Sequence, residues 1–435
     1  MFSAIARVFR TPDLRRKIWF TIGIIAIYRI GAFIPAPGVD YGTVQQCLAL
    51  GNTEGGAYSF VNMFSGGAML QVSIFALGIM PYITAAIIVQ LLRVVIPRFE
   101  NLQREGPQGQ AKLTQYTRYL TIALGTLNAT TIVTMARSGA LLSCDLPIVP
   151  DDSLGVILLM ILTLVTGVAL IMWLGEQITE RGVGNGMSIL IFVSIGAGFP
   201  GAMGEIWSTQ GWRIFALVLL IGLVAIAAVV FVEQSQRRVP VQYAKRQVGR
   251  RTLGGSSTYI PIKVNMAGVI PVIFASSVLT LPSVIAQFNQ PAPGEDVGPV
   301  MQFIQQYFSG GTHPVYMICF FLMTIFFTYF YVTITFNPNE VAENMRKFGG
   351  FIPSVRAGRP TERYLSYVIS RITFPGSLYL GFIALIPMIA MVLLGVSQSF
   401  PFGGTSILIM VGVGLTTVKQ INAQMEQRNY EGLLR

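Results

Sequence analysis

The sequence predicts an all-α, polytopic membrane protein, and three observations carry that prediction. Of the 435 residues, 53% are hydrophobic and only 11% are charged, whereas a soluble protein carries about 25% charged residues. Long apolar segments recur along the whole chain, and the mean hydropathy is +0.62. Basic residues gather in alternate connections between those segments, which is the pattern of a chain that crosses a bilayer repeatedly.

Ten apolar segments are predicted to be transmembrane helices, because a hydrocarbon core about 30 Å thick needs roughly 20 helical residues. They cover residues 18–34, 73–93, 116–137, 153–175, 186–206, 212–232, 264–286, 314–336, 367–395 and 403–421. The least regular is 186–206, since glycines and a proline crowd its second half. An even number of crossings places both termini on the same side.

One apolar stretch does not fit a single crossing. Residues 55–92 contain no Asp, Glu, Lys, Arg or His. One straight helix of that length would extend about 57 Å, and no polar turn sits near its middle. We expect a short helix that enters the membrane and stops, then a full span, with the break at Gly66–Gly67. Because irregular backbone is not tolerated against lipid, the chain is predicted to enclose a pathway.

Charge placement predicts the orientation. The N-terminal tail and the connections after the second, sixth and eighth segments are basic, and the opposite connections are mainly acidic. The basic side faces the cytoplasm, so both termini are expected there, in the cell membrane. Cys47 and Cys144 fall in outward connections, where a disulfide can persist. Either they form a bridge or both are unpaired thiols, while Cys319 is expected to pack inside a span.

Two cytoplasmic connections are long enough to carry function. Residues 234–263 hold seven basic residues and no acid, and their strand-like flanks predict a β-hairpin with its tip near Arg250–Arg251 and Gly254–Gly255. Either orientation bias alone placed the charges, or the hairpin docks an acidic partner, RNA or protein. Residues 337–366 carry turns around Arg356, and on pattern alone they are a solvated connector.

Motifs for chemistry are missing, so the chain is not expected to be an enzyme or to bind a metal. The sequence has no phosphate-binding loop and no H-E-x-x-H or G-x-S-x-G motif, and its single histidine is His313. The mid-span carboxylates typical of ion-coupled transporters are absent, which favours a passive, apolar conduit. Arg29 lies deep in the first span, where it either extends outward or bonds neighbouring carbonyls.

Long ordered motifs resemble the SecY family, the pore subunits of the bacterial Sec preprotein translocase. They run through the whole chain: IPAPGVD at 34–40, the stretch 60–92, QYTRY at 115–119, ITERGVGNGMSI at 178–189, QRRVPVQYAKRQ at 236–247, VNMAGVIPVIFASS at 264–277, NPNEVAENMRKFGGFIPSVRAG at 337–358 and FGGTSILI at 402–409. The resemblance implies ten helices in two pseudo-symmetric five-helix halves, 1–208 and 209–435, around an hourglass pore. It also implies a half-helix plug at about 57–71.

The same resemblance assigns roles to individual residues. The plug would include Phe60, Asn62, Phe64, Ser65, Gly66 and Gly67. The pore ring would consist of Ile79, Ile83, Met187, Ile191, Ile273 and Ile409, in which the methionine departs from an all-isoleucine pattern. A lateral gate would be lined by Thr84, Gln90, Ser276 and Ser277. Arg250, Arg251 and Arg356 would dock a motor or ribosome. On the resemblance, the connection 337–366 is therefore a docking segment and not only a solvated connector.

Pattern alone leaves alternatives to two of these roles. An apolar i,i+4 pair such as Ile79 and Ile83 shares one helix face, and that face could contact lipid instead of a pore. The hydroxyls of Ser276 and Ser277 could bond to carbonyls of their own helix instead of bonding across a gate, where each bond would contribute about 0.6 kcal/mol.

The expected function is conduction of unfolded secretory proteins across the membrane, with lateral release of membrane-protein helices. Expected partners are SecE and SecG as a heterotrimer, the SecA motor ATPase, the ribosome, signal-bearing polypeptides and membrane lipids, with no cofactor. The alternative is an ion- or metabolite-coupled secondary transporter, a class that also uses paired halves and broken helices.

Overall fold

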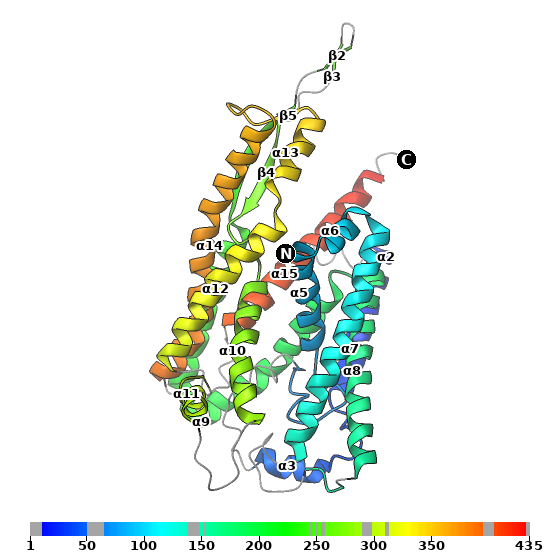
Figure 1. Cartoon of the computed structure of the whole chain (residues 1–435), viewed down its shortest axis with the longest axis vertical. Coiled ribbons are helices and arrows are strands. Elements are labelled where there is room, and N and C mark those ends of the chain that lie inside the picture. The colour runs from blue at the N-terminus through cyan, green and yellow to red at the C-terminus, as the bar shows by residue number, and fades with distance from the viewer. Residues whose placement is uncertain are drawn as a thin grey trace. The chain divides into compact units, whose positions relative to one another are not determined.

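The computed structural model describes residues 11–49, 65–137, 148–151, 153–243, 246–248, 251–253, 257–288, 298–308, 313–394 and 404–431. Helices dominate it (Figure 1). The chain forms two compact units: Met1–Gly211 with Val413–Arg435, and Trp212–Gly412. The C-terminal segment therefore groups with the first unit, whereas the expected halves assign it to the second.

The first unit is built from long helices around an irregular stretch. Its helices are α2 (Pro12–Gly31), α3 (Tyr41–Ala49), α5 (Met80–Val95), α6 (Pro97–Arg104), α7 (Pro107–Arg137), α8 (Leu154–Arg181), the first part of α9 (Gly186–Gln234) and the later part of α15 (Gly404–Glu431). The helix α9 is interrupted at Gly211, whose φ is 77°. The largest buried cluster joins α7 and α8 to the non-helical residues Met69, Val72 and Ala76.

The second unit combines membrane-length helices with a small sheet. After α9 come β1 (Gln236–Tyr243), β2 (Arg246–Val248), β3 (Arg251–Leu253), β4 (Ser257–Lys263), α10 (Ile270–Phe288), α11 (Pro299–Phe308), α12 (Pro314–Thr335), α13 (Pro338–Lys347), β5 (Gly350–Phe351), α14 (Arg359–Leu394) and the start of α15 (Gly404–Glu431). The sheet has the order β4-β1-β5, and β2 pairs with β3. The predicted β-hairpin is thus confirmed.

Within the described residues, seven helices are long and apolar enough to cross a membrane, and two shorter apolar helices are Met80–Arg93 and Ile270–Leu279. The all-α polytopic prediction is confirmed, while the count of ten spans stays a prediction. Two predicted boundaries are wrong. Residues 73–79 and 264–269 are not helical, because α5 begins at Met80 and α10 at Ile270.

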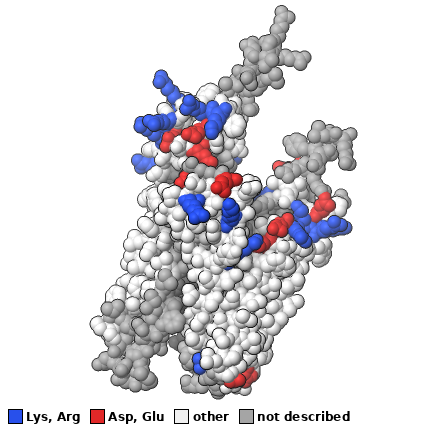
Figure 2. Space-filling model, turned by 45° about the vertical axis from the view of Figure 1, so that its right-hand side comes forward, with Lys and Arg blue, Asp and Glu red and all other residues white. Residues whose placement is uncertain are grey.

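Charged side chains are unevenly distributed over each unit. In Figure 2 they gather over the β4-β1-β5 sheet with α13, and over the α6 end of the first unit, while the long helical flanks are almost free of blue and red. The flanks expose large apolar side chains instead, among them Leu158, Leu162, Leu220 and Phe326. A helix surface of this kind is suited to lipid.

Candidate functional site

The most irregular feature of the first unit is the stretch 65–79, which we call the limb. Helical structure stops at Ser65, and residues 66–79 form successive turns. Gly66, Gly67 and Gly78 have φ values of 67°, 90° and 56°, a region that glycine adopts without steric cost. The predicted break at Gly66–Gly67 is confirmed. The predicted start of the following span at residue 73 is wrong, because the chain stays non-helical through Ile79.

Backbone hydrogen bonds hold the limb against the residues that follow α2. Ala36 N donates to Val72 O at 2.9 Å, and Ile74 N donates to Ile34 O at 2.9 Å. The opposite side of the limb touches α8: a Cβ added at Gly167 would lie 2.1 Å from Ile74 O. The limb is therefore enclosed by protein, which satisfies the requirement for irregular backbone at membrane depth.

The limb adopts a costly conformation. Val72 is fully buried and β-branched, yet its φ is 45°, in a region that such residues rarely enter. Gln71 Oε1 and Ser73 Oγ are buried without a hydrogen-bond partner. Backbone strain of this kind costs roughly 1–3 kcal/mol per residue and persists only where the surroundings enforce it. The limb is thus held in place by its neighbours and not by its own local preference.

The predicted ring residues are divided between the two units. Ile79, Met187 and Ile191 are buried in the first unit, and Ile273 and Ile409 in the second, while Ile83 is half-buried. Ile83 N donates to Ile79 O at 3.1 Å, so the two residues are one turn apart, although Ile79 precedes the helix that was predicted to carry both. The thioether of Met187 packs over Gly175 of α8, where an added Cβ would lie 2.2 Å from the sulfur.

The predicted gate hydroxyls bond within their own helices. Thr84 Oγ1 donates to Met80 O at 3.0 Å. Ser276 Oγ and Ser277 Oγ each donate to Ile273 O at 2.8 Å, which is the alternative considered from sequence. Gln90 is half-buried on α5. Their role in a gate stays a prediction.

Of the predicted plug residues, Ser65, Gly66 and Gly67 lie at the start of the limb. Ser65 is buried, and its hydroxyl accepts a hydrogen bond from Met69 N at 3.1 Å. Phe60, Asn62 and Phe64 lie outside the described residues. The plug role itself stays a prediction.

A repeated motif introduces both α5 and α10, and sequence reasoning missed it. Gly78, Pro81 and Ile83 recur as Gly268, Pro271 and Ile273, in the pattern G-x-x-P-x-I. The backbone repeats as well: Ile83 N donates to Ile79 O at 3.1 Å, and Ile273 N donates to Val269 O at 3.3 Å. An internal comparison of the sequence would have found this signal. It places one predicted ring isoleucine in the first turn of each helix.

Of the predicted docking arginines, Arg251 lies on β3 and Arg356 follows β5. Val248 of β2 pairs with Arg251 of β3. Arg250 and Gly254–Gly255 lie outside the described residues. Arg356 is exposed between two turns, and its carbonyl accepts a hydrogen bond from Thr361 Oγ1 at 2.8 Å.

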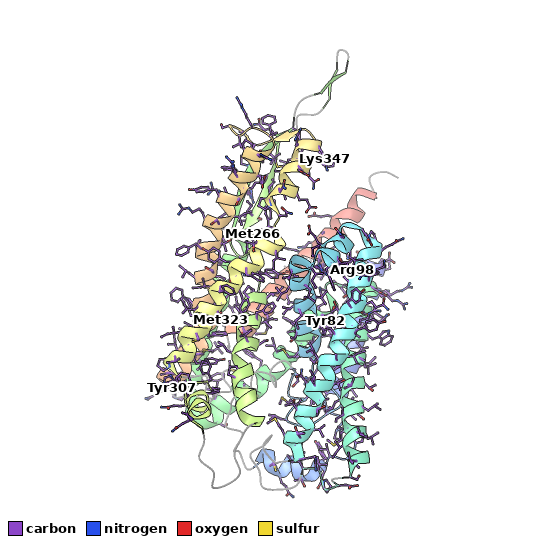
Figure 3. The ribbon with its side chains drawn as sticks, in the orientation of Figure 1. Tyr82, Arg98, Met266, Tyr307, Met323 and Lys347 are labelled. Carbon is purple, nitrogen blue, oxygen red and sulfur yellow. The ribbon has the colours of Figure 1, made fainter. Side chains whose placement is uncertain are left out.

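Strand β5 joins the two connections 234–263 and 337–366, which sequence reasoning did not predict. Tyr243 of the first connection pairs with Gly350 of the second. Beneath the sheet lies a shared apolar cluster that includes Val241, Ile262 and Leu365. The cationic side chains therefore extend from one folded platform, and Figure 3 marks its edge at Lys347 on α13.

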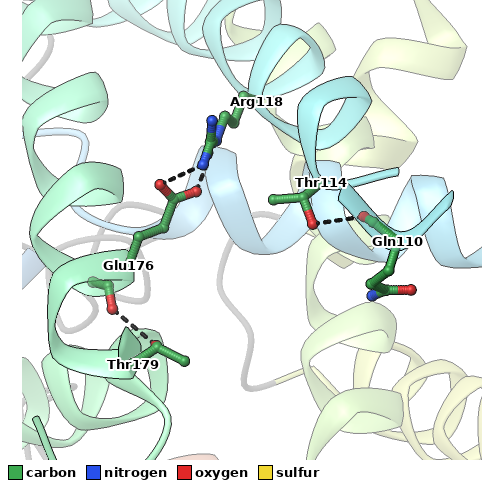
Figure 4. Close-up of polar contacts among 6 residues, drawn as sticks. Gln110, Thr114, Arg118, Glu176 and Thr179 are labelled. Carbon is green, nitrogen blue, oxygen red and sulfur yellow. Dashed lines mark hydrogen bonds and ion pairs between the residues drawn. The ribbon is translucent and has the colours of Figure 1, made fainter. Parts of the chain in front are cut away.

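An ion pair joins two helices of the first unit. Arg118 of α7 donates from Nε and Nη2 to the two carboxylate oxygens of Glu176 on α8, both at 2.8 Å (Figure 4). This bidentate geometry is the strongest form of the Arg–carboxylate contact. Because Arg118 is nearly half exposed, we assign the pair an orienting role with a small energy.

Two of the three cysteines lie within the described residues. Cys47 is disulfide-bonded and Cys319 is a free thiol. Cys144 lies outside the described residues, so the predicted pairing stays a prediction. The described part of the chain contains no group of three or more His, Cys, Asp or Glu residues that could hold a metal ion.

Comparison with known proteins identifies the family. The SecY family model matches residues 73–418. Protein translocase subunit SecY from Micrococcus luteus is 66% identical over 436 residues, covering 100% of both chains, and the subunit from Streptomyces scabiei is 59% identical over 445 residues with the same coverage. The chain belongs to the SecY family.

The fold is also similar to two solved structures of low sequence identity, a protein-conducting channel and Sec61 in a canine ribosome–channel complex. Their identities are 19% and 18% and their TM-scores 0.63 and 0.60, and each match covers 94% of this chain and 92% of the other.

The family assignment confirms the resemblance inferred from the motifs. The SecY motif at 264–277 contains the second copy of G-x-x-P-x-I, and the motif at 60–92 contains the first. Both motifs thus include the point at which a non-helical segment is followed by an apolar helix.

Proposed function

We propose that the chain is the channel-forming subunit of a protein translocase, which conducts unfolded secretory proteins across a membrane. One observation carries the proposal: two relatives named protein translocase subunit SecY match the chain from end to end at 66% and 59% identity. A multi-pass helical fold with an enclosed irregular limb supports a conduit. The described residues offer no metal cluster for chemistry.

The mechanism is gating. Branched apolar side chains such as Ile83 and Ile409 offer no hydrogen bonds that would trap a passing peptide, and a narrow apolar constriction resists water and ions. Residues 57–71 act as the plug, and helices α5 and α10 part to release apolar segments into lipid. The hydroxyls of Ser276 and Ser277 both donate to Ile273 O of their own helix.

Directed movement comes from partners. SecE and SecG complete a heterotrimer, and the SecA motor ATPase or the ribosome drives polypeptide through it. Arg251 of β3 and Arg356, which follows β5, support this docking, because guanidinium groups recognise carboxylates and phosphates. The complex lies in the cytoplasmic membrane with both chain termini in the cytoplasm.

The test is transport of a signal-bearing precursor into vesicles that contain the purified heterotrimer, with ATP and the motor. We expect ATP-dependent protection of the precursor from protease. Arg251→Glu and Arg356→Glu each reduce transport, while Arg213→Glu, at the other end of the second unit, serves as a matched control and leaves it unchanged. Full transport by both variants would exclude the docking role, and a saturable small-molecule flux without a motor would indicate a transporter.

The apolar constriction is tested in the same vesicles. Replacing Ile409 by Asn makes the constriction wettable, so ion leak rises and precursors with defective signals are accepted. Val418→Asn changes an exposed residue of the same helix and is the control. Equal leak from both variants would contradict the ring.

A further inference from the structure

Arg29 of α2 contacts the limb. Its Nη1 donates a hydrogen bond to Gly66 O at 3.1 Å, and its guanidinium lies over the ring of Phe33, 5.3 Å from the centroid. Of the two behaviours expected for this arginine, it therefore bonds a carbonyl. The acceptor belongs to the start of the limb and not to a regular neighbouring helix. The cation satisfies a backbone oxygen that no helix satisfies.

The contact is closely fitted at Gly66. A Cβ at this residue would lie 2.8 Å from Arg29 Nη1 and 3.2 Å from both Cα and O of Ser194. Gly66 therefore passes between α2 and α9, and its φ of 67° also requires glycine. Beside it, Tyr28 and Ser194 share a hydrogen bond of 2.6 Å between their hydroxyls. That bond fixes the two helices that flank the passing chain.

The two ends of the limb are held by different means. Farther along, Val72 and Ile74 are bonded through their backbones to residues 34–36, and such bonds persist whatever the side chains. At Gly66 the bond depends on the guanidinium of Arg29. This end is therefore the one that a change of one side chain can release.

We propose that Arg29 is a positioning residue that latches residues 65–67 between α2 and α9, and thereby holds the channel closed. The inference rests on the proposed function, in which residues 65–67 belong to the plug, residues 57–71. Opening must break the Arg29–Gly66 hydrogen bond, so the bond sets part of the threshold that a signal sequence has to overcome. Loss of the bond lowers that threshold and makes the channel less selective.

The experiment measures resting ion leak in vesicles containing the heterotrimer with Arg29→Gln, Arg29→Lys or no change. We expect Arg29→Gln to leak about tenfold more, as for a lost hydrogen bond to a charged group. Arg29→Lys keeps a charged donor and recovers most of the seal. The matched control is Arg371→Gln, because Arg371 also lies over an aromatic ring, 5.4 Å from the centroid of Tyr367, but belongs to the second unit.

A second readout reports the limb directly. Ser65 is fully buried, so Ser65→Cys in a Cys319→Ser background should react slowly with a water-soluble maleimide. Adding Arg29→Gln should raise the labelling rate about tenfold by the same argument. If Arg29→Gln does not assemble, Gly66→Ala takes its place, since the added methyl crowds Arg29 Nη1 and Ser194 and should produce the same leak.

The outcomes separate the latch from the proposed function. The latch would be overturned if Arg29→Gln showed the same ion leak and labelling rate as the wild type. It would also be overturned if Arg29→Gln and Arg29→Lys leaked equally. Unchanged leak in Gly66→Ala, where it replaces the first variant, would do the same. Precursor transport by the wild-type heterotrimer is measured alongside. If that transport fails, the proposed function is wrong; if it succeeds while Arg29→Gln stays sealed, only the latch is wrong.

Discussion

Helices α5 and α10 begin with the same G-x-x-P-x-I motif, but the segments that precede the motif differ. Each has a left-handed glycine, Gly78 or Gly268, then a proline in the first turn and a predicted ring isoleucine two residues later. The proline is pre-organised for a helix start and needs no backbone donor there. Helix start and side-chain direction are therefore set locally in both units.

What precedes the motif differs. Before Gly78 lies the limb, buried, strained at Val72 and held by α2 and α8. Before Gly268 lies a short link from β4, in which Asn265 Nδ2 donates to Glu233 and to Gly268 O. The link also leaves one buried atom, Asn265 Oδ1, without a hydrogen-bond partner, but only its glycine has a positive φ, whereas the limb includes Val72. The shared motif therefore defines where each helix begins, whereas the segment before it determines which part of the chain can move.

The largest effect is expected where the limb touches α8. Gly167→Val places a side chain against Ile74 O, a backbone atom that cannot rotate away. Overpacking of this kind costs about 1–3 kcal/mol, so the thermal midpoint of the purified protein falls and resting leak rises. Gly155→Val on the same helix meets nothing within 4 Å and is the control. Equal midpoints for the two variants would mean that the limb is not held by α8.

A smaller effect is expected at the link. Gly268→Ala meets no atom within 4 Å, so its only penalty is the φ of 62°, about 1–2 kcal/mol for a side-chain-bearing residue. Gly414→Ala in α15 has open space and no left-handed φ, and it should be neutral or slightly stabilising. Thermal midpoints of the two variants measure the difference. If Gly268→Ala were as stable as wild type, the shared motif would not require its glycine.

Sequence reasoning predicted the helices well because each long apolar segment must bury its backbone polar groups in a helix. It misplaced the starts of α5 and α10, since hydropathy cannot distinguish buried turns from a buried helix. Gly78 with Pro81, and Gly268 with Pro271, carried the missing boundary signal. The disruption at Gly66–Gly67 was predictable because the apolar run was too long for one crossing.

The site was less accessible to prediction. Arg29 was recognisable as a costly charge, but its acceptor is 37 residues away along the chain, and a sequence pattern does not record such pairs. The pairing of β1 with β5 is non-local for the same reason. The self-bonded hydroxyls of Ser276 and Ser277 were foreseeable, since serine commonly bonds a carbonyl of the preceding turn.

The smallest effect tests how far the limb's support extends along the loop that follows α2. At the end of this loop Asp40 accepts hydrogen bonds from Gly42 N at 3.0 Å and Thr43 Oγ1 at 2.7 Å. Chiefly through the Thr43 hydroxyl, these bonds lower the pKa of Asp40 below its ordinary value. The carboxylate therefore stabilises the start of α3 above the unfolded pKa of about 3.9. That contribution is lost as pH falls through the still lower folded pKa.

Amide hydrogen exchange of residues 41–47 measures this dependence. Protection should be constant near neutral pH and should decline below about pH 4, where the carboxylate binds a proton. Asp40→Asn keeps an N-cap acceptor without a titrating group, so its protection should not change over that range, and Asp151→Asn should leave the wild-type profile intact. The limb's own amides at Ile74 and Ala76 should respond to neither, because their bonds to Ile34 and Ser73 do not involve Asp40. A parallel loss of protection in the limb would show that the loop and the limb open as one unit.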